Sequence, residues 1–247
     1  MKDLSLLVAY RDRPAQIEAL VEWYQECQNL TKGNLELIVV ESSEESTEWL
    51  RKLDLVNMKY LHLKEDGPFN KSRILNAGLE LSESKYVTPF DVDLVPYNLS
   101  FSLHLALANQ SDIMLVTGFR VDTDLESFRP DQLSLLQSRA SIAKEDLHEG
   151  FMFDQLINKH RFGVLPFFKR TRLEEINGWD EAYVGWGCED QDIIHRYLGE
   201  ERYLIKSPDL VYLHLKHPHT PDWNDGDMTR KNRKILFEKF DLKPNVE

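Results

Sequence analysis

The sequence contains little cysteine and no long apolar run. Its 247 residues include two cysteines, Cys27 and Cys188, which are far apart and have no partner at metal-ligand spacing. This argues against a disulfide framework and a thiolate zinc site, and it favours a reducing compartment. The first apolar run, Leu4–Tyr10, is followed by charged residues and is too short for a signal-peptide core or a membrane span. We therefore expect a cytoplasmic protein with no transmembrane segment.

Basic residues are scarce relative to acidic ones. There are 30 Lys and Arg residues against 42 Asp and Glu, so the formal net charge is −12. Such a chain repels polyanions, and we expect no nucleic-acid partner. The sequence also has no Gly-x-Gly-x-x-Gly motif and no P-loop, which argues against a dinucleotide dehydrogenase and a P-loop NTPase. With 42% apolar residues the chain is otherwise an ordinary globular sequence, long enough for a substantial core.

Short apolar runs alternate with helical periodicity in the first third of the chain. The runs predict buried strands at 4–10, 35–40, 58–63 and 85–90. Helices are predicted from Pro14 onward, at 47–53 and at 69–81. This order predicts an α/β fold with a parallel sheet that binds ligands at the carboxyl ends of its strands. The later pattern predicts a helix at 131–143 within a weakly patterned segment 119–160, a strand at 161–169, a helical turn at 171–176, a loop at 178–188, a helix at 189–198, a strand at 210–214 and a helix at 229–240.

Two groups of metal-ligating residue types follow predicted strands. Asp91 and Asp93 come directly after the strand at 85–90 and, if the segment is strictly extended, they point the same way and can share a hard cation. Solvated turn chemistry is the alternative. Three of the eight histidines, His214, His217 and His219, follow the strand at 210–214 on a proline-rich loop. Asp93 with two of these imidazoles gives three metal ligands and leaves open positions, whereas the alternative is a surface turn.

The loop before the predicted helix 189–198 is unusually rich in glycine and tryptophan. Glycines on both sides of Trp186 let the backbone approach a ligand while the indole packs on a flat surface such as a sugar ring. Glu189, Asp190 and Asp192 open the helix, where carboxylates stabilise the positive end of the helix dipole. A carboxylate held there is expected to stay ionised near pH 7, as a general base must.

Basic side chains also follow predicted strands or open predicted helices. Arg11, Arg13, Lys71 and Arg73 have these positions in an otherwise acidic chain. Each one alone is an ordinary surface residue, but together at one edge of the sheet they suit the oxygens of a diphosphate.

These residues, in this order, resemble the β-1,4-galactosyltransferase family and its bacterial polysaccharide-synthesising relatives. The most specific match is the Gly-Trp-Gly-x-Glu-Asp-x-Asp block, and the matching stretches are 8–13, 69–78, 90–96, 176–180 and 185–192. The resemblance implies one GT-A domain over 1–247, with a mixed, mostly parallel central sheet flanked by helices. Its nucleotide-binding half would span about 1–118 and its acceptor-side, catalytic half about 119–247.

The resemblance further implies an inverting, metal-dependent glycosyltransferase. It would move a hexose or N-acetylhexosamine, with galactose or N-acetylgalactosamine favoured, from a UDP-sugar to a hydroxyl of an oligosaccharide or a lipid-linked glycan. Asp93, His214 and His217 would bind Mn²⁺, with Mg²⁺ as the alternative ion and His219 as a reserve ligand. The implied catalytic residues are Asp190, which would deprotonate the acceptor, and Glu189, which would bind a sugar hydroxyl. The implied nucleotide-sugar-binding residues are Tyr10, Arg11, Arg13, Phe69, Lys71, Arg73, Asp91, Val92, Asp93, Trp186 and Gly187.

Other functions stay open at this stage. A non-catalytic glycan-binding module could use Trp179, Trp186 and Trp223 as sugar platforms. A 2-His-1-carboxylate enzyme fits the ligand types, but the strand pattern lacks the density of an oxygenase barrel, and a haloacid-type phosphatase would carry its Asp-x-Asp near the first strand. The basic segment 229–240 could contact an anionic membrane from its inner face, although a solvated outer face is favoured.

Overall fold

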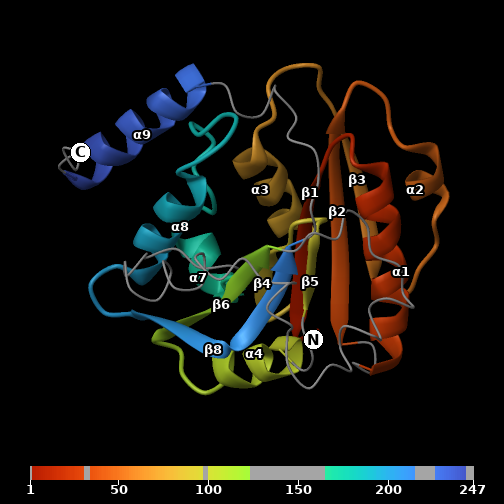
Figure 1. Cartoon of the computed structure of the whole chain (residues 1–247), viewed down its shortest axis with the longest axis horizontal. Coiled ribbons are helices and arrows are strands. Elements are labelled where there is room, and N and C mark those ends of the chain that lie inside the picture. Colours follow the sequence, from red (N-terminus) through yellow and green to blue (C-terminus); the bar gives the residue numbers. More distant parts are fainter. Residues whose placement is uncertain (1, 31–33, 97–99, 123–164, 215–225, 243–247) are drawn as a thin grey trace.

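The computed structural model describes residues 2–30, 34–96, 100–122, 165–214 and 226–242 (Figure 1). Strands and helices alternate through most of the described chain. In chain order they are β1 (Leu4–Tyr10), α1 (Pro14–Leu30), β2 (Leu35–Ser43), α2 (Glu48–Lys52), β3 (Met58–Lys64), α3 (Lys71–Leu81), β4 (Tyr86–Pro89), β5 (Leu94–Pro96), α4 (Ser100–Ala108), β6 (Met114–Asp122), β7 (Phe168–Lys169), α7 (Arg170–Glu175), α8 (Glu189–Leu198), β8 (Tyr203–His214) and α9 (Gly226–Phe240). None of the helices within these ranges is both long and apolar enough to cross a membrane.

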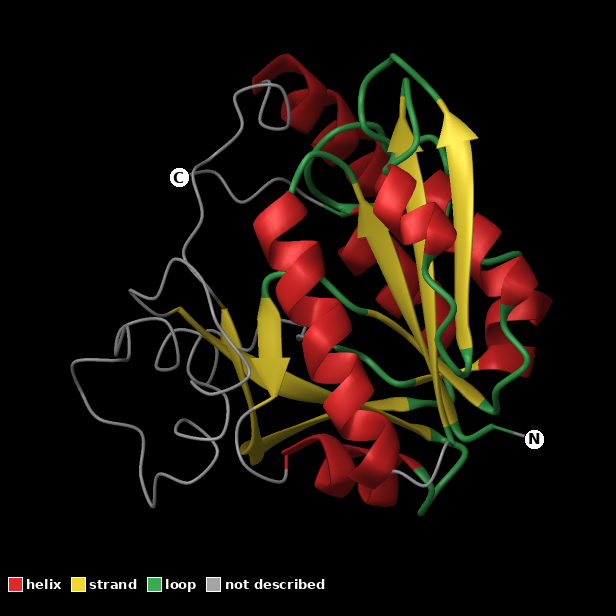
Figure 2. Ribbon diagram, turned by 90° about the vertical axis from the view of Figure 1, so that its right-hand side faces the viewer, coloured by secondary structure: helices red, strands yellow, loops and turns green. Residues whose placement is uncertain are grey.

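The larger sheet of the described chain has the strand order β3-β2-β1-β4-β7. The first four strands are parallel, and β7 joins the edge antiparallel to β4. Figure 2 shows these strands running between helices on both faces. Buried residues of α1 pack in one core cluster with β1 and β2, whereas buried residues of α3 and α8 pack in a second cluster. Burial on both faces explains why β1 and β2 are nearly continuous apolar runs.

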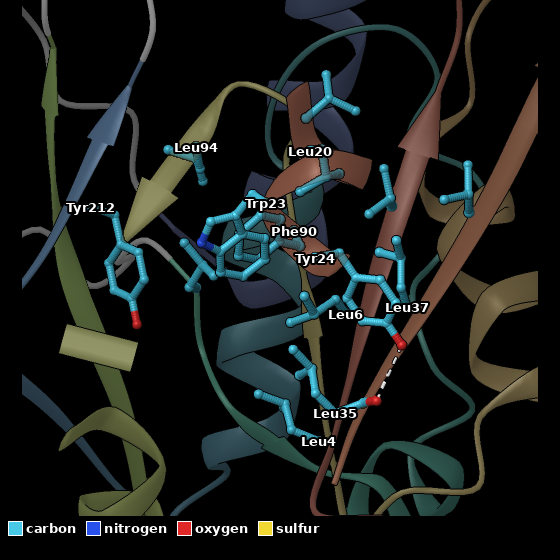
Figure 3. Packing of buried hydrophobic residues seen from close by; sticks show 14 of the residues in the cluster. Leu4, Leu6, Leu20, Trp23, Tyr24, Leu35, Leu37, Phe90, Leu94 and Tyr212 are labelled. Atoms are coloured by element: carbon cyan, nitrogen blue, oxygen red, sulfur yellow. Dashed lines mark hydrogen bonds between the residues drawn. The ribbon is translucent and has the colours of Figure 1, made fainter. Parts of the chain in front are cut away.

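Aromatic packing fixes the end of β4. The ring of Trp23 on α1 stacks on Phe90 with 5.5 Å between centroids, as Figure 3 shows. The backbone N–H of Phe90 donates to the carbonyl of Leu7 at 2.8 Å. Nearby, the hydroxyl of Tyr24 donates to the carbonyl of Leu35 at 3.2 Å. Truncating a buried aromatic ring of this kind typically lowers the free energy of unfolding by about 3–5 kcal/mol. The packing of Phe90 therefore holds the start of the segment that follows it in place.

A smaller sheet with the order β5-β8-β6 stands beside the larger one in the described chain. Its strand β5 is antiparallel to β8 and its strand β6 is parallel to β8. The fully buried His104 of α4 ties the sheet together, because its Nε2 donates to the carbonyl of Val116 and its Nδ1 accepts from the hydroxyl of Tyr212, both at 2.8 Å. Burial lowers the pKa of His104 to about 4, so this imidazole is neutral at pH 7.

The structure confirms the predicted fold class and most of the predicted elements. The mixed α/β sheet is mostly parallel, and the predicted bounds 4–10 and 189–198 match β1 and α8. The prediction was incomplete at α4 and β6, which it did not assign, and β8 begins at Tyr203 rather than at residue 210 because it pairs along β6. The predicted strand at 161–169 is reduced to Phe168–Lys169 among the described residues. The predicted helix 131–143 lies outside the described residues.

Candidate active site

The turn after β4 holds the two predicted metal-site carboxylates. The backbone N–H of Leu94 donates to the carbonyl of Asp91 at 3.1 Å, which makes residues 91–93 a turn. Asp91 and Asp93 consequently reach different partners: Asp91 Oδ1 lies 3.0 Å from Lys71 Nζ, whereas Asp93 Oδ2 contacts Arg13. The condition under which the two carboxylates would point the same way, a strictly extended segment, is not met here. Their predicted position beyond the carboxyl end of the strand is confirmed.

Strand pairing brings Asp93 next to His214. The antiparallel register of β5 and β8 sets Leu94 opposite His214, so the residue before Leu94 reaches the end of β8. Asp93 is 3% exposed, and its Oδ2 lies 3.6 Å from Nε2 of His214. The guanidinium of Arg13, from the loop after β1, contacts the same oxygen. We call Asp93, Arg13 and His214 the Asp93 cluster.

The Asp93 cluster fits part of a divalent-metal site. A buried carboxylate beside an imidazole provides the oxygen and nitrogen ligands that first-row divalent cations take in proteins. Two of the three predicted ligands, Asp93 and His214, are therefore together. Within the described ranges, no group of three or more His, Cys, Asp or Glu side chains is arranged to hold a metal ion. The other predicted ligands, His217 and His219, lie outside the described residues.

A second group of charges surrounds Lys71 at the start of α3. Burial disfavours the charge on Lys71, but the carboxylates of Asp190, Asp91 and Glu189 outweigh that effect and raise its pKa. Glu189 is 8% exposed, and its burial, assisted by the charge of Asp190 and opposed by that of Lys71, raises its pKa to about 7. We call Lys71, Asp91, Glu189 and Asp190 the Lys71 cluster. The expectation that a carboxylate at this helix end stays ionised near pH 7 does not hold for Glu189, because its burial and the charge of Asp190 outweigh the charge of Lys71.

The loop before α8 is held against α3. Asn76 accepts a hydrogen bond from the backbone of Trp179 at 2.8 Å and donates to the carbonyl of Trp179 at 2.9 Å. Gly178 has a φ of +60°, and a Cβ there would overlap Oδ1 of Asn76, so both the conformation and the space require glycine. Further along, the N–H of Gly185 donates to the carbonyl of Phe69 at 2.8 Å. These contacts hold the loop beside α3, at the edge of the site.

The tryptophans of this loop have different surroundings. Trp186 is 57% exposed and is free to meet a ligand, whereas Trp179 is 2% exposed and packs edge-on against Phe168. The use of Trp179 as a sugar platform, which the glycan-binding alternative assumed, is therefore wrong. Trp223 lies outside the described residues. Sequence reasoning also missed Asn76 as a determinant of the loop, although this residue lies in the matched stretch 69–78.

The remaining basic side chains lie nearer the ends of β2 and β3. Arg11 donates to the carbonyl of Gly67 at 2.8 Å and to Oγ of Ser42 at 2.7 Å, and it lies over the ring of Phe69 at 5.3 Å. Arg73 pairs with Glu65 at 2.6 Å. Of the other predicted nucleotide-sugar residues, Tyr10 and Val92 are buried, and Gly187 has a φ of +99°.

Comparisons with known proteins agree with this architecture. Residues 154–218 match a family model described as the N-terminal domain of galactosyltransferase, and this match includes the loop around Trp186, α8 and β8. No curated protein matches the chain significantly. The catalytic domain of Drosophila beta1,4-galactosyltransferase 7, solved with xylobiose, is 16% identical with a TM-score of 0.48, over 83% of this chain and 65% of that chain.

GalNAc-T7, solved with UDP, GalNAc and Mn²⁺, is 11% identical with a TM-score of 0.63, over 96% of this chain and 48% of that chain. The chain thus spans less than two thirds of the length of either solved protein, at 65% and 48%. At this identity the likeness to GalNAc-T7 concerns the fold, which is the GT-A fold. The chain thus shares the GT-A fold with this solved structure, and its residues 154–218 match the galactosyltransferase model.

Proposed function

We propose that this protein is a glycosyltransferase, which moves a hexose or N-acetylhexosamine from a UDP-sugar to a glycan hydroxyl, with inversion and with a divalent cation. One observation carries the proposal: the turn at 91–93 joins the Asp93 cluster to the Lys71 cluster. Cation-binding groups and a group of carboxylates are therefore linked by the two ends of one turn. A transferase needs this combination, because it must stabilise a departing diphosphate close to an acceptor that loses a proton.

The basic residues support a nucleotide-diphosphate donor. Arg13 and Lys71 already pair with carboxylates, and Arg11 is held by Ser42 and the carbonyl of Gly67. A diphosphate offers these cations more negative charge than their present partners do, so they would turn to its oxygens. GalNAc-T7, which has the same fold, is known with UDP, GalNAc and Mn²⁺. We propose galactose or N-acetylgalactosamine as the donor sugar.

The Asp93 cluster would hold the cation. Asp93 and His214 provide two ligands, with His217 as the third, and Mn²⁺ or Mg²⁺ bound there supplies Lewis-acid stabilisation of charge on the leaving diphosphate. Arg13 would remain beside this charge as a second positive group. The exposed indole of Trp186 would pack on a sugar ring and keep water from the reacting carbon.

The Lys71 cluster would move the proton. Asp190, in the first turn of α8, accepts the proton of the acceptor hydroxyl while that oxygen bonds to the anomeric carbon and the bond from that carbon to UDP breaks. Lys71 offsets the negative charge that three carboxylates concentrate around it. Glu189, with its pKa near 7, accepts from or donates to a sugar hydroxyl according to its own protonation.

A screen of UDP-sugars with and without Mn²⁺ tests the proposed function. We expect the protein to release UDP slowly from UDP-galactose or UDP-N-acetylgalactosamine, without an acceptor, and only with the metal. Asp93→Asn should lose this release, and Asp112→Asn is the matched control, because Asp112 is exposed and pairs with Lys169 away from the site. A protein that binds a glycan array but neither binds nor cleaves any UDP-sugar would instead be a glycan-binding module.

The acceptor and the location of the protein are also proposals. Leu236 of α9 is buried against the body of the protein, while Lys231, Arg233 and Lys234 of the same helix are exposed. We propose a cytoplasmic protein that glycosylates an oligosaccharide, with this basic face in solvent. Sedimentation with anionic vesicles tests the alternative, in which the basic face meets a membrane that carries a lipid-linked acceptor.

A further inference from the structure

The C-terminal helix α9 lies beside α8 and the loop that precedes it (Figure 1). Its residue Asn232 is 1% exposed, and Nδ2 donates to the carbonyl of Val184 at 2.9 Å and to the carbonyl of Trp186 at 3.3 Å. One amide group therefore holds the backbone on both sides of Gly185. An amide buried this deeply is costly unless it is hydrogen-bonded, so these two contacts determine where it lies.

Gly185 itself is enclosed from two directions. Its N–H is bound to Phe69, and a Cβ at this position would come within 3.0 Å of Sδ of Met228 on α9. The other neighbour of Trp186, Gly187, has nothing within 4 Å of its Cβ position and a φ of +99°. Asn232 therefore holds the carbonyl of Trp186 immediately before Gly187, where the loop is open.

The last turn of α9 is fixed by charge. Nζ of Lys239 lies 2.6 Å from Oδ2 of Asp180 and 2.6 Å from Oδ1 of Asp192. Asp192 is fully buried and also accepts from Arg196 at 2.6 Å and from the hydroxyl of Tyr183 at 3.3 Å. Asp192, which belongs to the Gly-Trp-Gly-x-Glu-Asp-x-Asp block, thus joins α8 to α9. This contact fixes the register of α9 and with it the position of Asn232.

We propose that Asn232 is a positioning residue for the acceptor side of the site, acting through Trp186. It fixes the backbone from which the exposed indole projects, and Lys239 keeps the helix in the register that this requires. The inference rests on the proposed transferase function only for its kinetic consequence, which is weaker acceptor binding without a change in the binding of UDP. The structural consequence, a displaced Trp186, does not depend on any reaction.

The test uses Asn232→Asp, which keeps the size of the side chain but replaces its donor with an acceptor. The five tryptophans are labelled with 5-fluorotryptophan, and the Trp186 signal is assigned in the ¹⁹F spectrum by its loss in Trp186→Phe. We expect this signal to shift or broaden in Asn232→Asp, while the signals of the buried Trp23 and Trp179 stay in place. Lys231→Gln, an exposed change on the same helix, should leave the spectrum unchanged.

Kinetics then separate the positioning role from the function itself. We expect Asn232→Asp to raise the acceptor KM about tenfold, because small misplacements of substrate contacts are costly, while the affinity for UDP with Mn²⁺ changes less than twofold. A folded Asn232→Asp protein with an unchanged Trp186 signal would overturn the inference. A displaced Trp186 in a protein that binds no UDP-sugar would support the positioning role and refute the proposed function. If Asn232→Asp does not fold, Lys239→Met replaces it in the test. An unshifted Trp186 signal in a folded Lys239→Met protein would then overturn the inference.

Discussion

The Asp93 cluster and the Lys71 cluster are neighbours that differ in their balance of charged groups. In the first, one buried carboxylate faces a guanidinium and an imidazole, and in the second, one lysine faces three carboxylates. They also form differently, since strand pairing between β5 and β8 assembles the first and the amino ends of α3 and α8 assemble the second. In the proposed reaction the two clusters would divide the work: the first would balance the charge of a diphosphate, and the second would take up a proton.

The largest expected effect follows from removing the carboxylate of the Asp93 cluster. Asp93→Asn should reduce metal-dependent UDP release on the order of 10⁴-fold, because it weakens both cation binding and leaving-group stabilisation. His214→Ala should act in the same direction. The measurement is UDP release over a Mn²⁺ titration, with Asp112→Asn as the control. Turnover at the wild-type level in Asp93→Asn would remove this residue from the metal site.

The matching change in the Lys71 cluster should affect chemistry and spare binding. Asp190→Asn is expected to lower the rate of transfer about 10³-fold, as the loss of a general base does, while calorimetry shows unchanged binding of UDP with Mn²⁺. This contrast with Asp93→Asn is the sharpest test of the division between the clusters. Full transfer by Asp190→Asn would mean that another group accepts the proton. Weakened UDP binding would mean that the Lys71 cluster also binds the nucleotide, so that the two clusters have no separate roles.

The sequence predicted the groups of the site better than their geometry. Strand-end positions correctly placed Asp91 and Asp93 at the edge of the sheet, and the helix-start pattern correctly opened α8 at Glu189. The divergence of the two aspartates depends on a turn hydrogen bond to Leu94, and no spacing rule contains that information. The raised pKa of Glu189 likewise depends on burial by residues distant in sequence.

The smaller sheet shows where prediction from local pattern stops. β8 continues from Tyr203 through Lys206, Ser207 and Pro208, a polar stretch that does not look like a strand by itself. It is a strand because β6 pairs with it, and the register shift between Thr117 and Phe119 accommodates the irregular stretch. Residue types alone could suggest Asp93 and His214 as partners, but their proximity depends on this strand, which ends at His214.

A smaller effect is expected from the one cation of the Lys71 cluster. Lys71→Met removes the charge that lowers the pKa of Glu189, so the pKa of this carboxyl should rise further above its usual range. The titration of the Glu189 carboxyl, followed by NMR, should then move upward by about one unit, together with a higher KM for the UDP-sugar. Arg73→Met is the comparison, because Arg73 pairs with Glu65 instead. An equal shift of this titration in both variants would mean that Lys71 has no specific effect on Glu189.

The smallest effect concerns stability. The pKa of Glu189 is about 7 in the native protein against a reference of 4.5, so between these values the native state holds a proton that the unfolded chain has lost. Stability must then fall as the pH rises through this window, by at most about 3 kcal/mol, and the deficit persists above it. Glu189→Gln cannot ionise, so its melting temperature relative to wild type should be a few degrees higher at pH 8 than at pH 5. Asp93→Asn should show no such gain, because it deprives Arg13 of its carboxylate at both pH values. Equal responses of the two variants in thermal melts would mean that the clusters do not differ electrostatically.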